Sequence, residues 1–193
     1  KGKIIPFEES AILDEANIIS LAGGNLGGKG RGLAFINNLI QNYDFSAHIP
    51  NINIRAPLTS VIGTVEFEQF LERNNFEEKI LDETNYEVIK KWFLNGHLSD
   101  GLNKKLKKLL RKINKPIAIR SSGLFEDSLM QPFAGIFSTY ILPNNNPDIE
   151  VRLKETTDAI KLVYASVFSN TARDYIKAIN YKIEEEKMAV IIQ

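Results

Sequence analysis

The residues near the start of this chain that could do chemistry lie in a glycine-rich segment at 23–32. It reads Gly-Gly-Asn-Leu-Gly-Gly-Lys-Gly-Arg-Gly, with six glycines in ten positions. Because glycine loses more backbone freedom on folding than any other residue, such a run is typical of a backbone that takes positive φ or approaches something closely. A helix beginning directly after it would offer unpaired N–H groups and a positive dipole end to an anion, and Lys29 would add a point charge. The segment predicts a phosphate-binding site or, alternatively, a tight turn with a solvated lysine.

A second candidate anion site follows the short apolar strand predicted at 117–119. Arg120 comes directly after this strand, and its planar guanidinium matches the geometry of phosphate oxygens. The hydroxyls of Ser121 and Ser122 and the backbone N–H groups around Gly123 would complete an anion pocket. A serine hydrolase is disfavoured, because neither serine stands in the nucleophile-elbow pattern.

Two acidic residues lie a few positions beyond this arginine. Glu126 and Asp127 could orient Arg120 or balance its charge. The structural alternative is an ion pair between the arginine and a carboxylate that does no more than close a loop. The residue types by themselves leave both interpretations open.

Two well-known nucleotide-binding motifs match this chain poorly. Residues 23–29 fit the pattern G-x-x-x-x-G-K, but Gly30 stands where a P-loop needs the Ser or Thr that ligates Mg²⁺. The Rossmann fingerprint G-x-G-x-x-G is absent. His48 and His97 lie in a turn and near a predicted helix end, and we interpret both as structural rather than catalytic.

The composition excludes several other classes of protein. The chain has 193 residues, with 24 basic and 24 acidic side chains and no Cys. The absence of Cys excludes disulfides and Cys-based metal or nucleophile sites, and zero net charge argues against a dedicated nucleic-acid binder. No apolar run approaches the roughly 20 residues that span a bilayer, and no signal peptide is visible. We therefore expect a cytoplasmic protein without nucleic-acid or membrane partners.

The local charge is less even, because residues 104–115 are rich in lysine. This segment is either a surface for nucleic acid or membranes or the outer face of an amphipathic helix. We favour the helix, because leucines recur at helical spacing and the segment lacks the interleaved aromatic residues on which bases stack.

Predicted helices and strands alternate along the chain. Apolar spacing predicts helices from about residue 28, from Thr64, over 86–94, after Ser99, after 146–148 and from Asn170. A short apolar run at 18–22 and strands at 52–62, 117–119, 136–142 and 188–193 complete the pattern. Thr64 and Asn170 are expected to cap their helices. The mixture predicts an α+β domain with helices packed on one face of a mixed sheet.

These segments, in this order, resemble the ATP-binding N-terminal domain of pyruvate phosphate dikinase and phosphoenolpyruvate synthase. The resemblance covers nearly the whole chain. It rests on Gly27-Gly28-Lys29-Gly30, Arg120-Ser121-Ser122, Glu126-Asp127, Phe133-Ala134-Gly135 with Thr139-Tyr140, the pair of segments 163–168 and 172–175, and the strand 188–193.

The resemblance implies the first lobe of an ATP-grasp-like fold, in which two α+β lobes hold ATP between them. Lys29 would match the family's lysine on the ATP phosphates, and Arg120 its phosphate-contacting arginine. Both would be electrostatic clamps rather than acid–base catalysts. Gln193 would lie at the edge of the adenine pocket. The further nucleotide-binding residues that it implies are Gly27, Gly28, Ser121, Ser122, Glu126, Asp127, Gly135 and Thr139.

We expect the chain to be a fragment, a partial nucleotide-binding domain over 1–193 with 1–115 and 116–193 as possible subdomains. It opens on Lys1-Gly2-Lys3 without a Met and stops on a strand. In the family, ATP phosphorylates a histidine on a swivelling domain, which passes the phosphoryl group to pyruvate on a third domain. The resemblance thus implies ATP, Mg²⁺ with ligands beyond residue 193, and phosphohistidine and pyruvate-binding domains downstream in the same chain. The fragment alone is expected to be inactive.

One departure from the family leaves a second function open. Family members usually carry Pro-x-Gly-Phe before the helix expected at Thr64, whereas residues 55–60 here read Arg-Ala-Pro-Leu-Thr-Ser. This departure places the chain in a divergent branch. The alternative to an ATP-dependent phosphotransferase is a catalytically inactive, nucleotide-sensing or regulatory module of the same fold.

Overall fold

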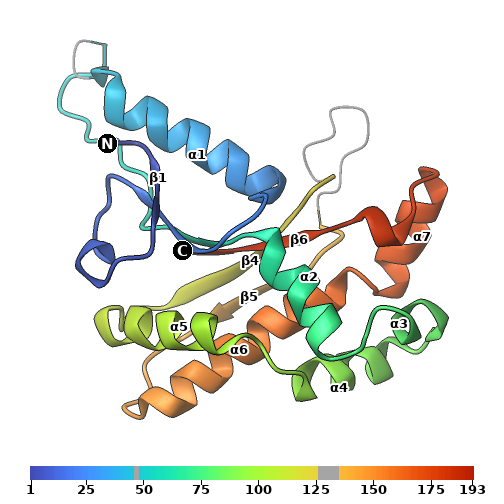
Figure 1. Cartoon of the computed structure of the whole chain (residues 1–193). Coiled ribbons are helices and arrows are strands. Elements are labelled where there is room, and N and C mark those ends of the chain that lie inside the picture. Colours follow the sequence, from blue (N-terminus) through green and yellow to red (C-terminus); the bar gives the residue numbers. More distant parts are fainter. Residues whose placement is uncertain (46–47, 126–134) are drawn as a thin grey trace.

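The structure is built on one mixed sheet of six strands (Figure 1). It is a computed structural model, and it describes residues 1–45, 48–125 and 135–193. The strands are β1 (Ile4–Pro6), β2 (Ile18–Ala22), β3 (Ser60–Ile62), β4 (Ile117–Gly123), β5 (Thr139–Leu142) and β6 (Met188–Ile192). Their order across the sheet is β1-β2-β3-β6-β4-β5. The first three strands run parallel, and every pairing on the other side of β3 is antiparallel.

Strand β6 joins the two halves of the chain. It pairs with β3 on one side and with β4 on the other, so the last strand in the sequence lies in the middle of the sheet. All five of its residues are buried. The segments 1–115 and 116–193 therefore contribute strands to a single sheet.

The helices cover both faces of this sheet (Figure 1). They are α1 (Gly27–Asn42), α2 (Thr64–Arg73), α3 (Lys79–Asp82), α4 (Tyr86–Asn95), α5 (Asp100–Lys112), α6 (Ile149–Ser166) and α7 (Asn170–Ala178), with short 3₁₀ turns η1 (Glu9–Ala11) and η3 (Ile183–Glu185). Helices α2, α4, α5, α6 and α7 contribute to one large core, whereas α1 packs on the opposite face. The α+β class with a mixed sheet is confirmed. The prediction that all helices pack on one face of the sheet was wrong, because α1 packs on the opposite face.

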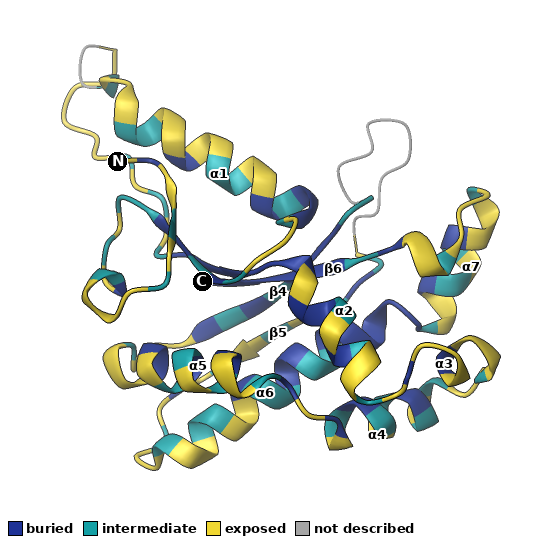
Figure 2. Ribbon diagram, in the orientation of Figure 1, coloured by how far each residue is buried: buried dark blue, intermediate teal, exposed yellow. Residues whose placement is uncertain are grey.

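The alternation of side chains along the strands separates the two cores. Val190 and Ile192 of β6 belong to the large core, while Ile191 between them faces α1. Together with Ile18 and Val61, Ile191 forms a small core. Leu33 and Ala34 of α1, and Leu26 just before this helix, pack against it. Successive side chains of a strand point to opposite faces, so a fully apolar strand such as β6 is expected where both faces are covered (Figure 2).

Burial also differs along α1. Leu33 and Ile40, which helical spacing predicts on one side, are partly buried, but Ile36 and Leu39 from the same predicted set are 50% and 44% exposed. Helix α1 therefore contacts the rest of the protein along a narrow stripe.

Side-chain caps begin most of the long helices on the large-core face. Ser99, Asp148 and Ser169 each accept a hydrogen bond from a backbone N–H in the first turn of α5, α6 and α7. The predicted cap at Asn170 was wrong by one residue, because the hydroxyl of Ser169 reaches the amide of Ala172. The predicted cap at Thr64 was also wrong: the helix begins at this residue, after Gly63.

Two short elements were missed and two strands were predicted too long. Strand β1 and helix α3 have three and four residues, too few to show a hydrophobic period. The strand predicted over 52–62 is confined to Ser60–Ile62, and residues 51–53 before it are exposed. Pro57 lies just before this strand, and a proline cannot donate a ladder hydrogen bond. The strand predicted over 136–142 begins at Thr139.

The lysine-rich segment is an amphipathic helix, as favoured above. Four leucines of α5 are buried in the large core. On its outer side, Lys108 pairs with Glu9 at 3.0 Å and Lys107 pairs with Glu150. The lysines thus cover a solvated helix face and hold it to neighbouring elements.

Tyr164 of α6 carries a buried hydroxyl that has no hydrogen-bond partner among the described residues. Its side chain is fully buried, and its ring contacts Phe67 and Phe70. Burial, with the nearby charge of Glu66, raises the pKa of this phenol well above its usual range. Burial therefore separates the hydroxyl from bulk solvent, and none of the described protein groups forms a hydrogen bond with it.

Tyr164→Phe should therefore stabilise the fold. We expect the free energy of unfolding to rise by about 1 kcal/mol, because the cost of burying an unpaired hydroxyl disappears. Urea unfolding followed by circular dichroism measures this change. Tyr43→Phe is the control, since Tyr43 is 47% exposed and its substitution should leave the midpoint unchanged. A loss of stability in Tyr164→Phe would contradict the assignment.

Candidate functional site

The glycine-rich segment links the end of β2 to α1 and is anchored to the start of α2. The backbone N–H of Asn25 donates to the Thr64 hydroxyl at 3.0 Å, and the N–H of Thr64 donates back to the Asn25 carbonyl at 3.0 Å. The N–H of Val65 donates to the Gly23 carbonyl at 3.2 Å. The loop therefore satisfies amides at the start of α2, which explains why Thr64 does not cap its own helix.

The start of α1 is locked onto strand β4 through Ser122. Its side chain is fully buried, and its hydroxyl donates to the Leu26 carbonyl at 2.7 Å and accepts from the Gly30 N–H at 2.9 Å. Gly27 has a φ of 66°, and a Cβ at this position would lie 1.8 Å from the Ser122 carbonyl oxygen. A glycine is required at 27 because the two backbones touch.

Lys29 lies in the first turn of α1, beside β4. Its Nζ lies 3.4 Å from the hydroxyl of Ser121. Two N–H groups of this helix start are already occupied inside the protein, since Gly27 donates to the Asn25 carboxamide at 2.9 Å and Gly30 donates to Ser122. The positive end of the helix dipole and the ammonium group of Lys29 still lie together at this point. The strand–loop–helix order is that of a P-loop, but Gly30 supplies no hydroxyl where a P-loop has its metal ligand.

Arg120 lies in the middle of β4, on the face of the sheet that carries α1. It is paired with Ile191, whose side chain packs under α1, and residues directly opposite one another in antiparallel strands share a face. Its Nη1 donates to the Gln193 carboxamide oxygen at 2.6 Å, and the Gln193 amide donates to the Thr59 hydroxyl at 3.1 Å. The structure thus places Arg120 one residue from the serine that Lys29 contacts.

The part of this face formed by β4 and β5 is open beside Arg120. Thr139 pairs with Arg120 and is exposed, and Ile141 on the same strand is 77% exposed. The small core under α1 involves β2, β3 and β6 instead. A polyanion could therefore lie along the open strands next to the start of α1. Gly135 is exposed at the edge of the described residues, and Glu126 and Asp127 lie outside them.

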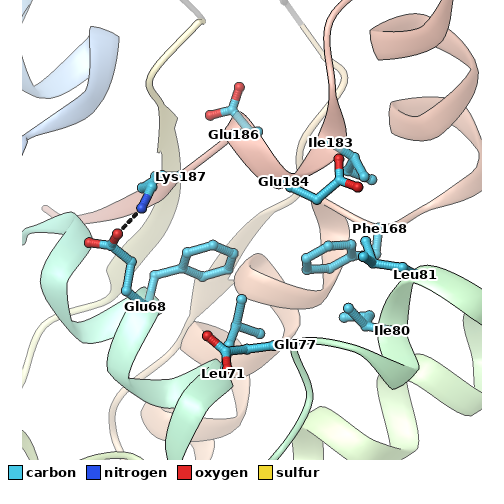
Figure 3. A pocket seen from close by; sticks show the side chains of 11 residues that line it. Glu68, Leu71, Glu77, Ile80, Leu81, Phe168, Ile183, Glu184, Glu186 and Lys187 are labelled. Carbon is cyan, nitrogen blue, oxygen red and sulfur yellow. Dashed lines mark ion pairs between the residues drawn. The ribbon is translucent and has the colours of Figure 1, made fainter.

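Two cavities formed by the described residues include neither Lys29 nor Arg120. A cavity of about 210 Å³ opens between α2, α3 and the segment 183–187. The rings of Phe67 and Phe168 line it, as do Glu68 and Lys187, which form an ion pair (Figure 3). Its lining does not include Lys29 or Arg120. A second cavity of about 370 Å³ is lined by Gln193 at the end of β6, by large-core residues such as Ile117 and Ile192, and by charged residues such as Lys112 and Lys115.

The described residues show neither a metal cluster nor a membrane span. Within 1–45, 48–125 and 135–193, no group of three or more His, Asp or Glu side chains is arranged to hold a metal ion. Within the same ranges, no helix is long and apolar enough to cross a membrane.

The sequence of residues 24–193 matches the family described as pyruvate phosphate dikinase, AMP/ATP-binding domain. The match begins inside the glycine-rich segment and includes both candidate anion-binding segments. The chain belongs to this family. Membership, together with the mixed sheet and its packed helices, confirms the ATP-grasp-like α+β fold. The chain is therefore an AMP/ATP-binding domain of the kind described for pyruvate phosphate dikinase.

One curated relative is the uncharacterized phosphotransferase YvkC of Bacillus subtilis (strain 168). It is 28% identical over 136 residues, which are 69% of this chain and 15% of the relative. The match thus spans less than a sixth of the relative's length.

Substitution of Gly27 tests the contact between α1 and β4. Gly27→Ala should lower the free energy of unfolding by about 3 kcal/mol or more, because the residue has positive φ and its Cβ would collide with backbone. Gly32→Ala is the matched control in the same helix, since a Cβ there meets nothing within 4 Å. It should stabilise the helix by up to about 1 kcal/mol. Urea unfolding measures both, and equal effects would contradict the proposed contact.

Proposed function

We propose that this chain is the ATP-binding portion of a cytoplasmic, ATP-dependent phosphotransferase that resembles phosphoenolpyruvate synthase and pyruvate phosphate dikinase. Lys29 and Arg120 hold the phosphates. The observation that carries this proposal is that α1 and β4 meet at Ser121 and Ser122, so that a lysine and an arginine 91 positions apart in sequence flank one junction beside an open sheet face. Membership in an AMP/ATP-binding family supports the nucleotide as the anion.

The two cationic side chains suit the chemistry of phosphoryl transfer. This reaction needs positioning and charge neutralisation more than covalent help from the protein. Lys29 supplies a point charge at the positive end of a helix dipole, and Arg120 supplies a planar fork that fits two phosphate oxygens. Both act as electrostatic clamps that hold the triphosphate.

The remaining nucleotide-binding residues are also part of this proposal. Thr139 and Gly135 are exposed, and we propose that they follow the triphosphate, as would Glu126 and Asp127. Ser121 is buried, and its hydroxyl would act through Lys29, which it contacts. Three further residues are buried and would act indirectly, because they hold the start of α1 in place: Gly27, Gly28 and Ser122. Gln193 lies at the end of β6 and contacts Arg120, and we propose that it lies at the edge of the adenine pocket.

Mg²⁺ and the acceptor belong to other parts of the proposed enzyme. When bound, Mg²⁺ would neutralise charge on the phosphates. The described residues form no cluster that would hold it, and we propose that its ligands lie beyond residue 193. The phosphoryl group would pass to a histidine and then to an acceptor such as pyruvate, on further domains of the same polypeptide.

Replacing either of the two cationic side chains, Lys29 or Arg120, in the full-length protein should abolish ATP-dependent phosphorylation. For Lys29→Ala and Arg120→Ala we expect the rate to fall at least about a hundredfold, because each loses a charge that is strongest in the transition state. The rate of phosphorylation is measured by the transfer of label from γ-³²P-labelled ATP. Lys91→Ala and Arg111→Ala are matched controls on the other face of the sheet, since both residues are exposed. Full activity in both site variants would contradict the assignment, and ATP binding without transfer by the unaltered protein would favour a sensing module.

The 193-residue chain by itself should bind Mg-ATP more weakly than the full-length protein. We expect at least about a tenfold difference in Kd, equivalent to 1.4 kcal/mol, because the nucleotide would be held from one side. Isothermal titration calorimetry with both proteins measures this difference. Equal affinity would show that a second lobe is not needed for binding.

A further inference from the structure

Arg120 is held by a chain of three hydrogen bonds that crosses the sheet. Arg120 Nη1 donates to Gln193 Oε1 at 2.6 Å, and Gln193 Nε2 donates to Thr59 Oγ1 at 3.1 Å. Thr59 Oγ1 then donates to the Pro57 carbonyl at 2.8 Å. The donors all point the same way, from β4 through the end of β6 to the residue before β3. Hydrogen bonds arranged in such a series strengthen one another.

The orientation of the Gln193 amide follows from its two neighbours. A guanidinium has no acceptor, so the amide oxygen must face Arg120 and the amide nitrogen must face Thr59. The hydroxyl of Thr59 gives its proton to Pro57 and can therefore accept from the amide. The backbone of Gln193 is also fixed, because it exchanges two hydrogen bonds with Ala118, at 2.7 and 3.1 Å. Backbone and side chain of Gln193 are thus both held in place.

The chemical type of this partner matters for an anion-binding arginine. A carboxylate at the same place would form a charge-assisted hydrogen bond about twice as strong as a neutral one, and it would cancel the positive charge of the guanidinium. An amide accepts one N–H and leaves the charge in place. A neutral partner can therefore orient Arg120 without competing with phosphate.

We propose that Gln193 is a positioning residue, which orients Arg120 toward the phosphates while leaving its charge intact. This inference rests on the proposed function, because it assigns the orienting partner of the phosphate-binding arginine. Thr59, which is buried, fixes the amide and is the second member of the arrangement.

Two substitutions of Gln193 in the full-length protein separate this role from a structural one. Gln193→Glu should weaken ATP binding about tenfold or more, because the carboxylate neutralises Arg120, and Gln193→Met should weaken it about threefold through loss of orientation. The thermal stabilities should rank in the opposite order, since the glutamate keeps a hydrogen bond to Arg120 and the methionine does not. Gln69→Glu, at an exposed position on α2, is the matched control and should change neither quantity.

The affinities of these variants for ATP and for adenosine are measured by calorimetry. The unaltered protein and Arg120→Ala are measured in the same way for comparison. A loss in Gln193→Glu that is several-fold larger for ATP than for adenosine supports the proposal. Equal losses for both ligands, or unchanged ATP affinity in Gln193→Glu while Arg120→Ala loses it, overturn the positioning role and leave the proposed function standing. Failure of the unaltered full-length protein to bind ATP, or full affinity in Arg120→Ala, overturns the proposed function and this inference with it.

Discussion

The contact between Ser122 and the first turn of α1 is the interaction on which the candidate site depends. A buried hydroxyl bridges the Leu26 carbonyl and the Gly30 amide, and Gly27 lies directly against the backbone of β4. Strand β4 and helix α1 come from different halves of the chain, so this contact decides where Lys29 lies relative to Arg120. Part of the glycine-rich segment is therefore explained by close packing between two elements, independently of any ligand.

One face of the sheet carries the large core, and the other face carries the proposed phosphate site. The large core packs several helices against one face. On the other face, the small core under α1 contains residues of β2, β3 and β6, and the start of α1 packs on Ser122 of β4. Arg120, Thr139 and Ile141 lie on the part that remains open. An arginine in the middle of a strand is tolerated there because its guanidinium reaches a neutral amide at the end of β6. Because Thr139 and Ile141 are exposed on this part of the face, it is where we propose that the triphosphate lies.

Much of the secondary structure was predictable because it depends on local patterns. The amphipathic helix α5 and its Ser99 cap follow from leucine spacing and one hydroxyl, and β6 follows from an unbroken apolar run. Strand β1 was not predictable, since three residues show no period and pair only because β2 lies beside them. The strand predicted over 52–62 was too long, because apolar composition does not reveal which residues find a partner strand. The cap of α7 shifted to Ser169, since neighbouring polar residues compete and geometry selects one.

The sequence by itself determined the α+β class, the family and the identity of the two candidate cations, since these are carried by residue types and their spacing. It did not determine that α1 lies on the opposite face from the other helices, that the hydroxyl of Ser122 is occupied within the protein, or that Gln193 and Thr59 hold Arg120. Arg120 and Gln193 are 73 positions apart, and Gln193 and Thr59 are 134 apart. Contacts of this range arise from the order and register of strands in the assembled sheet. Only the tertiary structure decides them, because hydrogen-bond geometry between distant residues has no local signature in the chain.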